Sequence, residues 1–549
     1  MGKAARVAGS LMLLLASASA ETIEANPSNY QSLVSTLQPG DTMLLAPGDY
    51  PDGFNIRDVY GTADAWIVIQ GPDSGPQPVF LGDPTVSRNT IEIRTGSYFA
   101  LENLTIDGQN IDGVFGISAA GSDTHHVRIE NCTIVGHGGH QQVVGISTKV
   151  TTWGWIIRRN RILGAGTGLY LGNADGSLPF IGGLIEYNLV EDAEGYCMQI
   201  KHQNSRPDLP GMPSTPQRTI IRHNVFLKTD RPSGDGDRPN LLVDGFPATG
   251  NGSQDHYEIY GNFFFHNPRE ALLQASGRVV IHDNVFVDCT YEGIFLVDHN
   301  TPLKTAHVYN NTFFAMNRAI HFVNTPDEAH SVFGNLMFAD SGVSGNFTNA
   351  SDNLFAAAAN AGDYVQNPSL VLGEMDFHPL VGQCQGPPLD LSAFLAHLDF
   401  DLDFNGAPKL LFTFRGAYAG EGLNPGWQLT NDVKGEAGGA PLPDTTPPTG
   451  SLAVDGGASQ TSDALVDLSI SAADPGANAS GMGPGAQMSF SNDGSTWSAP
   501  EPYGTSRADW DLAAFGGDDA PGPKTVHARL RDAAGNWTVA AITSDIELL

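Results

Sequence analysis

The sequence predicts an all-β protein in which a right-handed parallel β-helix is followed by a small β-sandwich. Two observations predict the solenoid. Short apolar segments with a central Asn recur along the chain, as in LENLTI and IEYNLV, and no amphipathic helical stripe accompanies them. The repeated residues are Asn103, Asn131, Asn160, Asn188, Asn224, Asn262, Asn284, Asn311 and Asn335. A variable repeat of this kind is typical of stacked coils.

The repeated Asn has a physical explanation in such a stack. Asn tolerates the turn conformation, and its side-chain amide can bond the Asn one coil above. A second strand column is expected at GISTK, GLYLG, MQIK, LLVDG, GIFLVD and AIHFV. Alternation places Ile146, Leu169, Met198, Ile294 and Ile320 inside. Their neighbours Lys149, Tyr170, Gln199, Lys201, Asp244, Phe295 and His321 should then line one external face, which solenoids use for extended partners.

Composition divides the chain into four sections. Residues 1–20 have two basic residues, a short apolar run and a small-residue site, which predicts a signal peptide cleaved after Ala20. The β-helix is expected over residues 21–430, with an N-terminal cap at its start and an irregular closing part at its end. Residues 431–449 have the Gly, Pro and Thr content of a linker. The alternating strands of residues 450–549 resemble bacterial immunoglobulin-like sandwich modules.

Charge and cysteine content restrict the partners. The chain has 28 Lys and Arg against 60 Asp and Glu, a formal net charge of −32, which argues against binding nucleic acid or anionic membranes. The apolar run near the N-terminus is too short to span a bilayer. A secreted or periplasmic monomer is therefore expected. Its four cysteines, at positions 132, 197, 289 and 384, either pair in that compartment or act as small buried hydrophobes.

One region opposes the acidic trend. Residues 201–238 contain seven basic residues against four aspartates, and they include the longest steps between repeated Asn residues. Functional residues concentrate in long loops on rigid scaffolds. A basic, loop-rich region suits an anionic polysaccharide. The alternative is that these cations only pair locally with Glu186, Glu191, Asp192 and Glu194.

A specific spacing occurs in this region. Lys201 follows EDAEGYCMQI, and Arg222 comes 21 residues later with His223 directly after it. This pattern resembles the Lys and Arg-His signature of polysaccharide lyase family six, the pectin-lyase-like group of alginate lyases and chondroitinase-B-like enzymes. The resemblance implies that Lys201 is the base and Arg222 the acid or stabiliser, beside a Ca²⁺ ion. Glu194 matches one carboxylate of the family, but Tyr196 stands where a second is expected.

The implied reaction is β-elimination from a uronic-acid-containing polysaccharide. Removal of the C5 proton requires that the uronate charge be neutralised, and Glu191, Asp192 and Glu194 are the expected oxygen ligands for Ca²⁺. His202 and His223 are alternative groups for proton transfer. Substrate contacts are expected from these two histidines and from Tyr170, Gln199, Arg206, Lys228, Arg238 and Asp244.

Two other functions remain open on the sequence. A glycoside hydrolase on the same fold needs paired carboxylates across the cleft, for which Asp244 and Asp298 are candidates. A non-catalytic β-helix used for glycan binding or adhesion is the third hypothesis, because fold alone does not imply function.

Overall fold

The computed structural model divides the chain into two units, Met1–Ala437 and Gly438–Leu549, which are described separately. It describes residues 20–435, 447–474, 482, 486–532, 536–538 and 540–549. The predicted signal peptide, apart from Ala20, and most of the predicted linker lie outside these residues.

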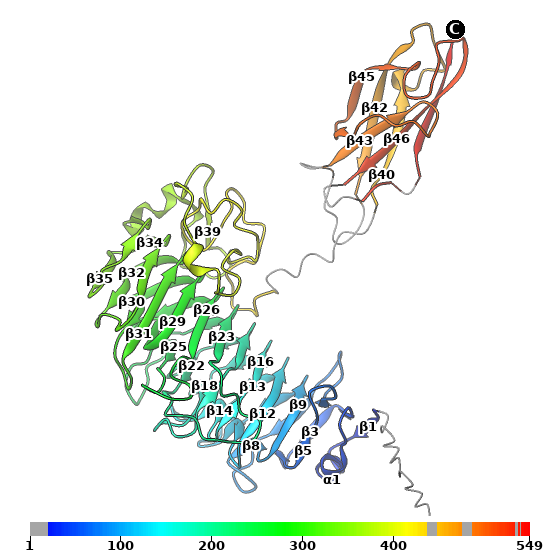
Figure 1. The fold of residues 1–549 in the computed structure, drawn as a ribbon. Helices are drawn as coiled ribbons and strands as arrows, with labels where there is room; N and C mark the ends of the chain where they lie inside the picture. Colours follow the sequence, from blue (N-terminus) through cyan, green and yellow to red (C-terminus); the bar gives the residue numbers. More distant parts are fainter. Residues whose placement is uncertain (1–19, 436–446, 475–481, 483–485, 533–535, 539) are drawn as a thin grey trace, which may run out of the picture. The chain divides into compact units, whose positions relative to one another are not determined.

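The first unit is a parallel β-helix, so the predicted fold class is confirmed (Figure 1). Its strands form three columns, named here A, B and C. Column A consists of β1 (Thr22–Ala25), β2 (Thr42–Leu45), β6 (Ile67–Gln70), β9 (Gly96–Glu102), β12 (Thr124–Glu130), β16 (Ile156–Arg158), β20 (Leu184–Glu186), β23 (Arg218–Arg222), β26 (His256–Tyr260), β29 (Gly277–His282), β31 (Leu303–Tyr309), β33 (His330–Phe333) and β36 (Ala350–Ser351).

Columns B and C belong to a second continuous sheet. Column B contains β3 (Gly48–Tyr50), β7 (Pro78–Leu81), β10 (Thr105–Asp107), β13 (Thr133–Val135), β17 (Arg161–Leu163), β21 (Leu189–Glu191), β24 (Val225–Leu227), β27 (Phe263–Asn267), β34 (Leu336–Phe338) and β37 (Leu354–Ala356). Column C contains β4 (Phe54–Ile56), β8 (Asn89–Ile93), β11 (Phe115–Ala119), β14 (Val144–Thr148), β18 (Thr167–Leu171), β22 (Met198–Ile200), β25 (Leu241–Val243), β28 (Leu273–Ala275) and β35 (Ser341–Gly345). The long strands β30 (Val285–Leu296) and β32 (Thr312–Phe322) run through both columns.

A short helical segment lies at the N-terminal end of the solenoid. Helix α1 (Tyr30–Leu33) continues into a 3₁₀ turn, η1 (Val34–Thr36), beside the first coils. The buried Tyr30 ring packs edge-on against Tyr50, Phe54 and Phe80. The cap therefore covers the apolar interior at the open end of the solenoid.

The repeated Asn residues form a buried ladder, although they do not all occupy one position. Seven of them, from Asn160 to Asn335, belong to this ladder, and Asn353 is its eighth and last member. From Asn188 to Asn353, each Oδ1 accepts hydrogen bonds of 2.8–3.1 Å from the backbone N–H and the Nδ2 of the Asn one coil earlier. The Oδ1 of Asn160, the first residue of the ladder, accepts from the backbone N–H of Cys132 at 3.0 Å. Asn103 and Asn131 instead stand one residue earlier in their coils, with φ of 57° and 53°. The prediction that one Asn supplies both the turn conformation and a bond between coils holds for these two, because Asn131 Nδ2 donates to Asn103 Oδ1 at 2.6 Å. It is wrong from Asn160 onward, where the residue before the ladder Asn adopts the turn conformation.

A closing segment, residues 357–435, packs on the outside of the solenoid. It contains η2 (Ala358–Asp363), β38 (Val365–Asn367), β39 (Asp376–Pro379) and η3 (Ser392–Phe394). The outward residues of column B are apolar here, and they share one core with the closing segment. This core includes Leu189, Val225, Phe263, Val285 and Leu336 from the columns, and Phe377, Phe404 and Tyr418 from the closing segment. The exterior of column B is therefore occupied.

The solenoid unit continues beyond its predicted end at residue 430. Asp432 forms an ion pair with Arg161, and Lys434 is 1% exposed. The Lys434 ammonium donates to the carbonyl of Gly261 at 2.8 Å and to the carbonyl of Phe404 at 2.6 Å. The first residues of the predicted linker are thus part of the closing segment.

The outward row of column A is a ladder of ion pairs followed by stacked rings. In register it contains Glu102, Glu130, Arg158, Glu186, Arg222, Tyr260, His282 and Tyr309. Ring centroids are 4.7 Å apart between Tyr260 and His282, and 4.8 Å apart between His282 and Tyr309. Phe394 of the closing segment extends this stack at 4.3 Å from Tyr309. The outward side chains of this row therefore contact one another or the closing segment.

The second unit is built from two small, mainly antiparallel sheets around one core. The first sheet has β40 (Thr449–Val454), β42 (Leu465–Ala473) and β45 (Ser506–Asp511). The second has β41 (Gln460–Thr461), β43 (Gln487–Ser491), β44 (Glu501–Pro502), β46 (Gly522–Arg531) and β47 (Ile542–Leu548). Residues of both sheets pack together, among them Leu468, Phe490, Trp510 and Leu530. A small sandwich is confirmed, whereas its resemblance to immunoglobulin-like modules stays a prediction.

Two smaller predictions are also settled. All four cysteines are buried and unpaired, as expected if they act as small hydrophobes. Within the described residues, no helix has both the length and the apolar content needed to cross a bilayer.

The Asn ladder gives a first test. Asn262→Ala should lower the free energy of unfolding by at least about 3 kcal/mol, because it removes the acceptor of the buried Asn224 backbone N–H and takes one buried donor each from the carbonyls of Ile221 and Tyr260. Asn131→Gly is the matched control, since Gly keeps the left-handed conformation and removes only the bond from the exposed Asn131 side chain to Asn103. It should change the free energy by less than about 1 kcal/mol. Urea denaturation of both variants measures this. Equal losses would show that the ladder does not carry the coil register.

Candidate functional site

Column C carries a partly exposed face on which several predicted residues meet. Its strands place Tyr170, Gln199 and Leu242 in one register on successive coils. Two residues further along each coil, the row continues with Lys149, Gly172, Lys201 and Asp244. The sequence prediction of one aligned outward face is thus correct for these residues.

Lys149 and Lys201 converge on the ring of Tyr170. The Lys149 Nζ lies 3.2 Å from the ring centroid, and the Lys201 Nζ lies 5.8 Å from it. Gly172, with φ of 84°, stands between the two lysines in the row. Because Gly172 has no side chain, both lysines reach the coil of Tyr170 from the coils on either side.

The two lysines have lowered pKa values. Burial and the charge of Lys201 lower the pKa of Lys149 to about 8. The Tyr170 ring opposes this effect, because an aromatic face favours the ammonium form. Burial also lowers the pKa of Lys201. The Asp244 carboxylate opposes this by raising that pKa, and the charge of Arg238 lowers it further. Of the two, Lys149 is the group poised to lose a proton near neutral pH.

Asp244 lies beside Lys201 in the row and is fully buried by loops. Its Oδ1 accepts from the Gly245 N–H and the Ser276 hydroxyl, both at 2.8 Å. Its Oδ2 accepts from His299 Nδ1 at 2.8 Å and from Asn300. Burial raises the pKa of Asp244, but these hydrogen bonds outweigh it and hold the pKa below its usual range. The carboxylate is therefore ionised.

An open groove of about 640 Å³ adjoins Asp244. It lies between the loops that follow β22, β25 and β30, and the predicted residue His202 lines it. The His202 Nδ1 lies 4.0 Å from Asp244 Oδ2. Among the described residues that line this groove there is no Lys or Arg; they include Gln203, Asn204, Phe246, Thr249, Asn300 and Thr301.

Arg222 lies elsewhere, so the structure does not bring it together with Lys201. It ends β23 in the ion-pair row of column A. Its Nε donates to Glu186 at 2.8 Å, and its Nη1 donates to the Tyr260 hydroxyl at 3.0 Å. The loop after Lys201 is long, so the chain has only reached column A after 21 residues. The residue that occupies the position of Lys201 on the next coil is Asp244. The spacing that suggested a catalytic pair is therefore coincidental.

His223 shares the surroundings of Arg222. It is buried with φ of 55°, and its ring stacks on Tyr187 at 4.9 Å between centroids. Burial, together with the charges of Lys434 and Arg222, holds its pKa well below the usual range. His223 thus does not contact the residues of column C, contrary to its predicted place in the substrate cleft.

The three predicted calcium ligands do not converge. Glu191 accepts a hydrogen bond from Asn431 at 3.3 Å, and Asp192 accepts one from Thr229. Glu194 accepts from Arg231 at 3.2 Å and from the Gly234 N–H. Among the residues described, no three His, Cys, Asp or Glu side chains are arranged to hold a metal ion. These residues therefore do not fit a Ca²⁺ site.

The other predicted substrate contacts have different fates. Arg206 is buried and ties its own loop by donating to Asp255 and to the carbonyls of Pro213 and Thr215. Lys228 is also buried and donates to the Arg238 carbonyl at 2.9 Å. Arg238 is partly exposed and lies 5.7 Å from the Tyr196 ring. Of these three cations, Arg238 is the one available beside Lys201.

The carboxylate pair considered for hydrolysis is not supported. Asp244 is ionised and surrounded by donors, so it is a poor proton donor. Asp298 is exposed, and its Oδ1 accepts from the Leu303 N–H at 2.8 Å, which is a turn contact. Neither carboxylate has the environment of a general acid.

Sequence reasoning missed two residues of the site, Lys149 and His299. Lys149 was placed on the outward face but not in the site. The signal was present, because GISTK and MQIK both end in Lys and stand two coils apart in one column. For His299 there was no such signal, since its contact with Asp244 depends on the path of a loop.

The solenoid is similar to solved β-helix enzymes. An alginate lyase from Paenibacillus sp. str. FPU-7 is 16% identical over 61% of this chain and 99% of that chain, with a TM-score of 0.32. The family-six alginate lyase AlyGC is 14% identical over 61% and 51%, with a TM-score of 0.37. Pectate lyase Pel9A is 12% identical over 76% and 97%, with a TM-score of 0.36. No protein-family model and no curated protein matches the chain. At these identities the likeness concerns the fold alone.

The lysine pair gives a second test. In NMR titrations of the ¹³C-methylated protein, Lys149 should titrate near pH 8. Lys201→Ala should move that titration to higher pH, because it removes a positive charge that disfavours the Lys149 ammonium. Lys304→Ala is the control, since Lys304 pairs with Asp327. A Lys149 titration that stays unchanged in Lys201→Ala would disprove the coupling.

Proposed function

We propose that the first unit is a polysaccharide lyase that cleaves a uronic-acid-containing polysaccharide by β-elimination on the face of column C. The observation that carries the proposal is the convergence of Lys149 and Lys201 on Tyr170, beside the ionised Asp244. A uronate is the sugar whose carboxylate matches such a cationic pair. The open groove next to the pair offers room for neighbouring sugars.

In this proposal Lys201 and Arg238 neutralise the uronate carboxylate. Asp244 favours the ammonium form of Lys201, and the guanidinium of Arg238 is charged at every relevant pH. Neutralisation matters because the C5 proton is α to the carboxylate, and negative charge develops there when it leaves. Fixed positive charges at that position stabilise the transition state more than the ground state.

Lys149, and not Lys201, is the proposed base. A lysine accepts a proton only in its neutral form, and Lys149 has a pKa of about 8. The neutral amine takes the C5 proton, and the electrons of that C–H bond form the C4–C5 double bond. The C4–O bond breaks at the same time. This assignment replaces the sequence hypothesis that Lys201 and Arg222 act together.

Tyr170 is the proposed proton donor to the leaving oxygen. Burial raises the pKa of its phenol, so the hydroxyl keeps its proton at neutral pH. Its ring is the surface on which both lysines meet. The three side chains thus supply the base, the countercharge and the acid that β-elimination requires.

The wider setting agrees with an exported enzyme. The basic pair faces an acidic polymer, while the net charge of −32 keeps the protein soluble. The alternative function is glycan binding without cleavage, which the same cationic pair would also support. Detection of a cleavage product distinguishes the lyase from the binding protein.

Activity gives the third test. Incubation with alginate, pectate and chondroitin should yield a product with the ultraviolet absorbance of a C4–C5 double bond. The rate should rise with pH through about 8, because neutral Lys149 is required. Lys149→Ala and Lys149→Arg should each lower kcat at least 100-fold, since general bases contribute on the order of 10² to 10⁴.

Arg222→Lys is the control for this assay, because Arg222 lies in the ion-pair row of column A. It should keep kcat within threefold of the wild type. Reducing ends without the new absorbance would indicate hydrolysis. Saturable binding without any product would indicate a binding protein, and either result would overturn the proposal.

A further inference from the structure

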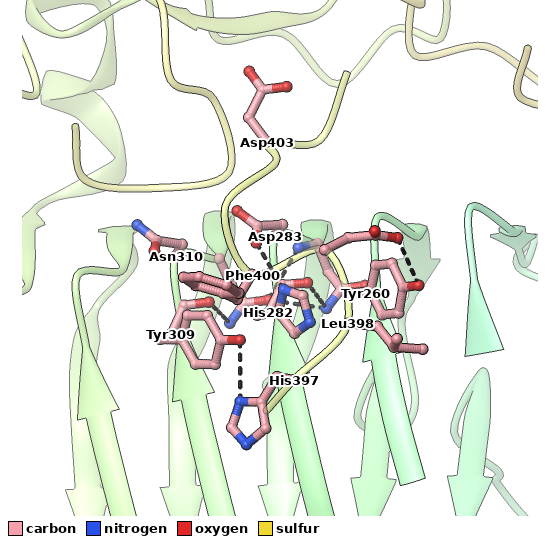
Figure 2. Close-up of polar contacts among 12 residues, drawn as sticks. Tyr260, His282, Asp283, Tyr309, Asn310, His397, Leu398, Phe400 and Asp403 are labelled. Carbon is pink, nitrogen blue, oxygen red and sulfur yellow. Dashed lines mark hydrogen bonds and ion pairs between the residues drawn. The ribbon is translucent and has the colours of Figure 1, made fainter. Parts of the chain in front are cut away.

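A cavity of about 220 Å³ lies between the solenoid and the closing segment, away from the lysine pair. The solenoid contributes Tyr187, Arg222, Tyr260 and Asp283, and the closing segment contributes Asp399 and Leu402. Figure 2 shows Tyr260, His282 and Asp283 at the ends of their strands, with the loop that carries Asp403 passing over them.

The cavity opens where a row of turn residues lacks a side chain. His223, Gly261 and Asp283 precede the ladder Asn on three successive coils, and all have positive φ. Gly261 has φ of 65°, and a Cβ there would lie 2.4 Å from the His223 ring. Glycine is therefore required at the centre of the row, and the space above it remains free.

One buried carboxylate oxygen in this wall lacks a donor. Asp283 is 2% exposed, and its Oδ2 accepts from Lys409 and from His282, both at 2.7 Å. Its Oδ1 accepts no hydrogen bond from any described residue. Leaving a buried carboxylate oxygen in this state is costly, and burial raises the pKa of Asp283 to about 7.

Carboxylates outnumber cations around the cavity. Arg222 pairs with Glu186 and Asp399, and Asp283 pairs with Lys409. Asp403 accepts three backbone N–H bonds, from Asn405, Ala407 and Ala419. An anionic ligand would therefore meet an excess of negative charge, whereas a neutral ligand with hydroxyl groups would not.

The remaining surfaces suit a small polyol. A hydroxyl can donate to Asp399, and it can accept from the Arg222 guanidinium, because both residues line the cavity. Leu402 supplies an apolar wall, and Tyr187 and Tyr260 supply aromatic rings. The volume equals that of about seven waters, which is room for one sugar ring and not for a chain.

We propose that this cavity binds a single neutral monosaccharide unit, in contact with both the solenoid and the closing segment. The inference does not depend on the proposed lyase activity, because it rests on different residues and on another column. A bound sugar would hold the closing segment on the solenoid and raise the temperature of unfolding.

Calorimetry and thermal unfolding test this with glucose, galactose and mannose, each compared with its uronic acid. At least one neutral hexose should bind saturably at one site and raise the unfolding midpoint. The matching hexuronate should bind at least tenfold more weakly. The variant Lys149→Arg should bind the hexose normally, which separates this site from the lysine pair.

Two variants locate the site. Leu402→Trp should fill the cavity and abolish hexose binding, whereas Leu423→Trp should leave binding unchanged, because Leu423 is exposed on the same segment. Asp399→Asn should weaken hexose binding at least tenfold. It replaces Leu402→Trp as the cavity variant if Leu402→Trp does not fold. The proposal is overturned if no neutral hexose binds, so that the cavity holds water only. It is also overturned if the uronates bind better, or if binding survives in both cavity variants.

Discussion

The buried ladder of asparagine amides is the constraint on which the rest of this structure depends. Each side-chain oxygen from Asn188 to Asn353 accepts two hydrogen bonds from the Asn one coil earlier, one from its backbone N–H and one from its Nδ2. Because the side chains from Asn160 to Asn335 are fully buried, these bonds cannot be replaced by water. The ladder therefore fixes the register of successive coils, while the step between two ladder residues varies from 18 to 38 residues.

A fixed register with variable coil length explains where the site lies. Side chains at equal distances from the ladder form straight rows, so each column presents one kind of surface. Column A pairs its charges and stacks its rings, and the closing segment covers column B from Leu189 to Leu336. Column C keeps Lys149, Tyr170 and Lys201 partly exposed. The long loops that follow Lys201 and Asp244 then shape the groove beside them.

The sequence predicted which side chains align along one column better than it predicted contacts between residues of different columns. The Asn period and the strand alternation were sufficient for the fold and for the outward face, because they depend on local pattern. The link between Lys201 and Arg222 failed because a loop of unknown path separates them, and counting residues does not tell which column the chain reaches. The calcium ligands failed for a related reason, since Arg231 comes from a distant loop and binds Glu194.

The central claim is that the uronate chain lies on column C. A crystal structure of the Lys149→Ala variant with a bound uronate oligosaccharide tests it most directly. The account predicts a chain across β18, β22 and β25, with one carboxylate against Lys201 and Arg238 and its C5 facing position 149. A chain bound instead along column A, with its carboxylate on Arg222, would contradict the account.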